Sequence, residues 1–186
     1  MKFWTLLLIL LAVLLVLNLS APSTSKGVSL DISKKIENDI STQFNDFCIR
    51  SLNYSEQNSS KIIAFVSLNP NSNCPSLVEM EYNLNPIYSR KIYLVKDCNV
   101  SGPIIQPEEA IIASSKDLDV QNIISKGGRA CASKPDVIDT TCCPLLWTGV
   151  NDFTKTLKRD PYWLVLWQQG SDKKFIALDE VGNIIP

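Results

Sequence analysis

Histidine is absent from this sequence of 186 residues. Its absence excludes Ser-His-Asp and Cys-His catalysis and every metal site that requires an imidazole ligand, while carboxylate, lysine and thiol chemistry remain open. An excess of either charge is also missing, since the net charge is -1. Because no basic stripe with interleaved aromatic residues is found, a role in binding nucleic acid has little support.

What the sequence does contain is typical of a globular protein. Hydrophobic residues make up 45% of it and charged residues 20%, a balance that argues against disorder. A chain of this length is sufficient for one ordinary domain or for two small ones.

The longest hydrophobic run occupies residues 3–19 and follows Lys2. It is longer than the core of a signal peptide, about 7–15 residues, and at the short end of a membrane span, about 17–25 residues. We therefore predict that residues 1–23 are a signal peptide or a membrane anchor, and both alternatives stay open. In either case the rest of the chain is expected outside the cytoplasm, secreted or anchored to the membrane by residues 3–19 if they are retained.

Residues 24–100 are predicted to form a helix followed by a three-stranded antiparallel sheet. Apolar side chains recur at every fourth position from Ile32 to Phe44 and continue at Phe47 and Cys48, which predicts an amphipathic helix over residues 29–50. Three segments bounded by turn residues then have the composition of strands. These segments are residues 61–68, 77–84 and 90–98.

A break at Ser101-Gly102-Pro103 is the predicted boundary with a second region, residues 101–186. Proline and two carboxylates at residues 107–109 indicate the start of a helix that extends to about residue 116. A second short helix is expected over residues 119–126, followed by irregular chain from residue 127 to 160 that contains one short strand near residues 145–150.

The end of the chain is predicted to be a hairpin of residues 162–167 and 174–179, with Gly170 in the turn between them. Both the odd and the even positions of the first strand are apolar, so both faces should be covered. Trp163 and Trp167 share one face, where core packing is favoured over stacking on a ligand.

The predicted fold class is therefore α+β: an N-terminal apolar helix followed by layers of helix and antiparallel sheet. Because each half reads as a helix followed by strands, two similar α-βββ halves are an alternative, although the halves show no convincing sequence similarity.

Six cysteines suggest structural disulfides, because an even number in an exported chain favours pairing. They are Cys48, Cys74, Cys98, Cys131, Cys142 and Cys143. Six cysteines allow 15 pairings, and since each half holds three, at least one bridge must cross between the halves if all of them pair.

Within these limits we expect Cys48 to pair with Cys74 or Cys98, and Cys131 with Cys142 or Cys143. A redox or metal site is the alternative, but a Cys-x-x-Cys motif is absent and adjacent Cys142 and Cys143 are poorly placed to chelate one tetrahedral ion. We predict no cofactor and no metal.

The remaining polar motifs do not indicate catalysis. Asn53, Asn58 and Asn99 fit the N-glycosylation pattern and fall in predicted loops. The adjacent carboxylates, such as Glu108 with Glu109 and Asp179 with Glu180, are explained by helix starts and turns rather than by acid–base catalysis.

The second region resembles the PepSY domain family. The resemblance rests on the helix start Pro107-Glu-Glu-Ala, the strands at residues 163–167 and 175–178, and the final Asp179-x-x-Gly-x-Ile turn. It extends at most over residues 101–186 and is interrupted by an insertion, about residues 127–160, that carries three cysteines. The resemblance implies a cystatin-like α+β layer in an exported protein, with peptidase inhibition or binding to an envelope component as its role and no catalytic residues.

We therefore predict a non-enzymatic extracytoplasmic module that binds a protein or an envelope component, with peptidase inhibition as one such role. Two alternatives come from other classes. One is a thiol–disulfide exchange protein that acts through Cys142 or Cys143, and the other is an anchored structural or adhesive surface protein.

Overall fold

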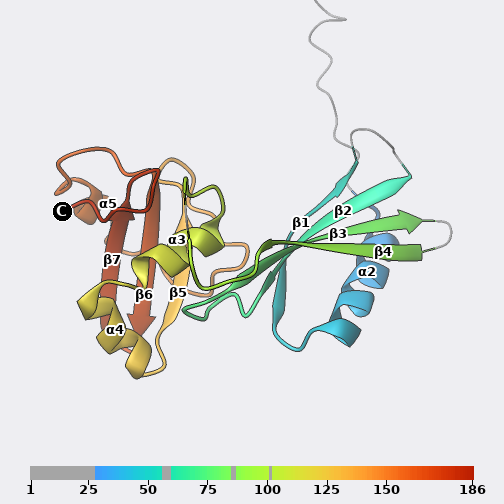
Figure 1. Ribbon diagram of the computed structural model, residues 1–186, viewed down its shortest axis with the longest axis horizontal. Coiled ribbons are helices and arrows are strands. Elements are labelled where there is room, and N and C mark those ends of the chain that lie inside the picture. The colour runs from blue at the N-terminus through green and yellow to red at the C-terminus, as the bar shows by residue number, and fades with distance from the viewer. Residues whose placement is uncertain (1–27, 56–59, 85–86, 101) are drawn as a thin grey trace, which may run out of the picture.

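The computed structural model describes residues 28–55, 60–84, 87–100 and 102–186. Within them, two antiparallel sheets lie side by side along the long axis of the molecule (Figure 1), which confirms the α+β class. The predicted signal peptide or anchor, residues 1–23, lies outside the described residues. No helix in the described part of the chain is long and apolar enough to cross a membrane.

The first sheet has the order β1-β2-β3-β4, and the second has the order β5-β6-β7. The strands are β1 (Phe47–Tyr54), β2 (Lys61–Leu68), β3 (Ser76–Leu84), β4 (Ile87–Val95), β5 (Arg129–Ser133), β6 (Trp163–Gln169) and β7 (Asp172–Leu178). The helices are α2 (Leu30–Gln43), α3 (Pro107–Ser114), α4 (Leu118–Ser125) and α5 (Val150–Thr154).

The prediction for the first half was wrong in one respect, because the first helix ends at Gln43 and residues 47–54 form a strand. Phe44 already has extended backbone, with φ at -137°. The polar pair Asn45 and Asp46 then interrupts the chain, and the apolar residues beyond it alternate as in a strand. The first sheet therefore has four strands rather than three.

Helix α2 covers one face of this sheet. Ile36 and Ile40 are fully buried there against even-numbered residues of β2 and β3 such as Ile62 and Met80. The Tyr82 hydroxyl donates to Asp39 Oδ2 at 2.9 Å, which joins β3 to the helix. Burial raises the pKa of Tyr82, and the hydrogen bond and charge of Asp39 raise it further.

The second sheet is covered on both faces, as its sequence predicted. Trp163, Val165 and Trp167 of β6 pack in one cluster with residues of α3 and α4, whereas Leu164 packs on the other side with partly buried residues between positions 138 and 157. Trp167 Nε1 donates to Ser114 Oγ at 2.9 Å, and Trp163 Nε1 donates to the backbone oxygen of Ile104 at 3.1 Å. Both tryptophans are core residues.

Strand β5 was missed, because residues 127–160 were expected to be irregular apart from a short strand near residues 145–150. Helix α5 begins at Val150 instead, and no strand is assigned to residues 145–150. The central residues of β5 are Ala130, Cys131 and Ala132, which have weak strand preference and are held by pairing with β6.

The hairpin of β6 and β7 forms as predicted, with Gly170 at a φ of +56° in its turn. The two halves differ in architecture: the first has four strands and one described helix, and the second has three strands preceded by α3 and α4. They are therefore not two copies of one α-βββ pattern.

Candidate binding site at the junction of the two sheets

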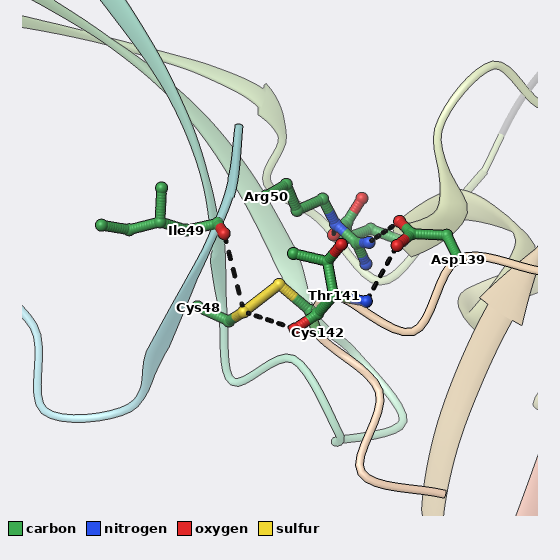
Figure 2. Close-up of a disulfide and its surroundings, with 7 residues drawn as sticks. Cys48, Ile49, Arg50, Asp139, Thr141 and Cys142 are labelled. Carbon is green, nitrogen blue, oxygen red and sulfur yellow. Dashed lines mark hydrogen bonds and ion pairs between the residues drawn. A yellow bond between two sulfur atoms is a disulfide. The ribbon is translucent and has the colours of Figure 1, made fainter. Parts of the chain in front are cut away.

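A disulfide between Cys48 and Cys142 ties the two halves together (Figure 2). Cys48 lies on β1 and Cys142 in the chain after β5; their Cα atoms are 5.7 Å apart, although 94 residues separate them in sequence. This is the crossing bridge that the cysteine count required. The expected partner of Cys48 was wrong, because Cys74 and Cys98 pair with each other.

The reason is the strand that replaces the end of the predicted helix. Phe47 and Ile49 pack toward α2, so Cys48 between them is directed to the opposite face of the sheet, on the side of the second half. Cys131 pairs with Cys143, which confirms the second expected pairing. All six cysteines are in disulfides, and three disulfides indicate an oxidising, extracytoplasmic environment.

Arg50 adds an ionic contact beside the disulfide. The register of β1 against β2 shifts between Ile49 and Ser51, so Arg50 has no partner residue across the strand pair. Its Nε donates to Glu108 Oε1 of α3 at 2.7 Å, and its Nη1 lies 3.5 Å from Asp139 Oδ2. The Glu108 side chain is completely buried and that of Arg50 is 15% exposed.

The two carboxylates at the start of α3 thus have different roles. Glu109 receives hydrogen bonds from the backbone nitrogens of Ile105 and Gln106 at 2.7 and 2.8 Å, as expected for a helix start. Glu108 instead holds Arg50, and its Oε2 has no hydrogen-bond partner among the described residues. Sequence reasoning missed this ion pair, because it placed Arg50 at the end of a helix and gave no sign that β1 lies beside α3.

Asp139 is the second acid on Arg50. It receives a hydrogen bond from the Thr141 backbone nitrogen at 2.8 Å, and its own backbone nitrogen donates to Ser133 Oγ at 2.6 Å. Burial alone would raise the pKa of Asp139, but the hydrogen bonds from Thr141 and the charge of Arg50 lower it below its ordinary value. Arg50 therefore faces an ionised Asp139 at neutral pH.

A pocket of about 390 Å³ opens beside this ion pair. Its polar residues are Arg50, Ser133, Lys134, Asp136 and Asp139, and its apolar residues are Pro107, Ala132, Val137 and Trp163. We call it the junction pocket, because residues of β1, α3, β5 and the chain after β5 all contribute to it. Its volume lies in the range of ligand sites, about 300–1,000 Å³.

The Lys134 ammonium stands over two rings at the edge of this pocket, 3.1 Å from the ring centroid of Tyr162 and 4.2 Å from that of Trp163. The attraction between an ammonium and an aromatic face holds the lysine in place. The junction pocket therefore offers an apolar lining with fixed charges of both signs. It suits one apolar or aromatic side chain flanked by polar groups.

A larger pocket, about 530 Å³, is lined by Tyr162 and neighbouring residues of the second half. Two of its charged residues are engaged with each other, since Arg159 Nη2 lies 3.1 Å from Asp179 Oδ2, and Asp179 also accepts hydrogen bonds from the turn that follows it. It draws its residues from the second half alone. We therefore take the junction pocket as the candidate site.

The other predicted sites are placed as follows. Asn53 is exposed but lies within β1 rather than in a loop, and Asn99 is exposed in the chain after β4. Asn58 lies outside the described residues. In the described ranges, no group of three or more cysteine or carboxylate side chains is arranged to bind a metal ion.

Searches of protein-family models, of curated proteins and of solved structures find no match to this chain. The resemblance of residues 101–186 to PepSY domains therefore stays a prediction.

Proposed function

We propose that this protein is a non-enzymatic extracytoplasmic module that binds a partner protein by accepting one of its side chains in the junction pocket. The observation that supports the proposal is the pocket itself, built where Arg50, Lys134 and Trp163 meet. Binding surfaces concentrate their affinity in a few such pockets, and aromatic and arginine residues are enriched in them.

The surroundings of the pocket favour binding without large motion. The Cys48–Cys142 disulfide and the pair of Arg50 with Glu108 hold β1 against the second half on one side of the pocket. A preformed site loses little conformational freedom when a ligand enters it, and affinity improves accordingly. Because the PepSY resemblance implies peptidase inhibition, the possible partners include an extracytoplasmic peptidase.

Photocrosslinking in the native host tests the proposal. Val137 lines the pocket and is 67% exposed, so a benzoylphenylalanine at this position leaves the core intact. Leu146 is 74% exposed and does not line the pocket, which makes it the matched control position. We expect a discrete crosslinked protein from position 137 and none from position 146.

The purified partner then allows a quantitative test. Val137→Trp should fill the mouth of the pocket and weaken binding at least tenfold, about 1.4 kcal/mol, whereas Leu146→Trp should not. Equal binding by both variants, or identical crosslinks from both positions, would exclude the junction pocket as the binding site. If the partner is a peptidase, the same pair of variants shows whether its inhibition depends on the pocket.

A further inference from the structure

Strand β4 forms one edge of the first sheet, at the opposite edge from β1 and its bulge (Figure 1). In an antiparallel sheet, alternate residues of an edge strand direct their N–H and C=O groups away from their neighbour. Within the described residues, no backbone hydrogen bond joins residues 90–95 to any segment other than β3. Among the described residues this edge is unpaired, so it can accept another strand.

The side chains along this edge are exposed on both faces of the sheet. Ile92, Tyr93 and Leu94 are 40%, 46% and 41% exposed. Ile92 pairs with Glu79 on the face away from α2, and Tyr93 pairs with Val78 on the face toward α2. Native proteins normally protect the edge strands of their sheets with charged residues, proline, bulges or a covering segment. Consecutive exposed apolar residues on an edge strand therefore mark an interaction site.

Charge indicates what this edge accepts. Arg90 and Lys91 precede the apolar residues, and Lys96 follows them. Arg90 makes no ion pair with any described residue, although it lies across from Glu81, which pairs with Lys61. Lys91 Nζ donates to Gln43 Oε1, and no carboxylate pairs with it in the described part of the chain. A second copy of this chain would present the same basic edge, so an acidic partner is favoured.

We infer that β4 is a strand-addition site for an extended, acidic segment of another polypeptide. In an antiparallel arrangement two apolar residues of this segment lie opposite Tyr93 and Ile92, and two acidic residues follow opposite Lys91 and Arg90. Regular pairing ends at Tyr93, because the register of β4 against β3 shifts at Leu94. Backbone bonds supply affinity in such complexes and alternate side chains supply specificity. The inference does not rest on the junction pocket.

The probe is a capped, fluorescently labelled peptide of sequence Thr-Val-Val-Glu-Glu-Thr, added to the exported protein with its disulfides intact. We expect saturable binding by anisotropy and slowed amide hydrogen exchange in residues 90–93. Two further peptides carry N-methyl groups on alternate residues. Only one alternate set of N–H groups faces β4, so one of these peptides should lose binding and the other should keep it.

Charge reversal supplies the second arm. Arg90→Glu with Lys91→Glu should weaken binding roughly tenfold, and a peptide with lysines in place of glutamates should regain it. The matched control reverses Lys34 and Lys35, two exposed neighbours on α2, and should change nothing.

The comparison of the two N-methylated peptides uses the unaltered protein. It therefore tests strand addition at β4 whether or not the charge-reversal variants fold. No binding, equal effects of the two N-methyl patterns, or unchanged binding after charge reversal would overturn the inference. Self-association in sedimentation with β4 protected in the absence of peptide would overturn it too, in favour of a second copy.

Discussion

Arg50 Nε lies 2.7 Å from Glu108 Oε1, although 58 residues separate the two in the sequence. The contact joins β1 of the first sheet to the first turn of α3 in the second half. Two residues before Arg50, Cys48 makes the disulfide that joins the same strand to Cys142. An ionic and a covalent contact therefore hold the two sheets together at one place, next to the junction pocket.

Removing Arg50 should destabilise the protein strongly. Arg50→Met leaves Glu108 completely buried without its cation, which typically costs about 3–5 kcal/mol of unfolding free energy. Glu108→Gln should cost less, because Arg50 keeps Asp139 as a partner. The double variant should be more stable than Arg50→Met alone, since no buried charge remains. Urea unfolding at neutral pH measures all three.

The control for these three variants is Lys155→Met. Lys155 and Asp152 are 76% and 87% exposed, and an exposed pair of this kind contributes at most about 0.5 kcal/mol. Equal losses for Arg50→Met and Lys155→Met would show that the buried pair has no structural role.

The disulfides should differ in their contribution to stability according to the length of chain that they close. Cys48 and Cys142 are 94 residues apart, whereas Cys131 and Cys143 are 12 residues apart. Chain-entropy arguments give about 4–5 kcal/mol for the long closure and about 3 kcal/mol for the short one. Replacing both members of a pair by serine and measuring the unfolding free energy tests the order. A larger loss from the short closure would contradict it.

Acid should destabilise the fold partly through Asp139. The folded-state pKa of this carboxyl lies below its ordinary value of 3.8, so its ionised form stabilises the fold. The contribution is complete above the ordinary value and is lost as the pH falls through the folded-state pKa. Asp139→Asn should therefore be less stable than the unaltered protein at neutral pH, and this difference should shrink toward about pH 2. Urea unfolding across this range measures the effect.

Asp136→Asn is the matched control for the acid experiment, because Asp136 lines the same pocket and makes no ion pair with any described residue. The same pH dependence in both variants would show that Asp139 is not responsible.

Gly182 should not tolerate a side chain. Its φ is +85°, and a Cβ atom added there would lie 2.8 Å from Ile104 Cδ1, which is fully buried. Gly182→Ala combines left-handed backbone with crowding and should cost about 2–4 kcal/mol. Gly102 has a φ of +97° with open space around it, so Gly102→Ala should cost only about 1–2 kcal/mol. Thermal and urea unfolding measure the stability of the two variants. Equal losses of stability would show that crowding against Ile104 has no effect.

The protein as it is exported should not reduce a substrate disulfide. All six cysteines are paired, so no thiolate is available to attack a substrate disulfide. Iodoacetamide should add no mass to the native protein and six carbamidomethyl groups after reduction, and insulin should not be reduced faster than in its absence. Turnover that Cys142→Ser or Cys143→Ser abolishes would favour the enzyme class over a binding module.

The sequence predicted the elements whose signals are local. The apolar residues at both odd and even positions from Trp163 to Trp167 indicated a strand covered on both faces, and proline with two carboxylates at residues 107–109 indicated where α3 begins. The count of three cysteines in each half required a crossing bridge, although not its partners. These predictions succeed because neighbouring residues on one strand, or in one helical turn, determine them.

The tertiary structure decided everything that depends on which distant segments meet. Phe47 and Cys48 continue the apolar spacing of a helix but belong to β1, which pairs with β2. This pairing turns Cys48 toward Cys142 and leaves Arg50 in a bulge facing Glu108. The short strand β5 exists because β6 offers it a partner. Periodicity along the chain indicates which residues share a face, but it does not show which segments 58 or 94 residues apart will meet, and the junction pocket depends on those contacts.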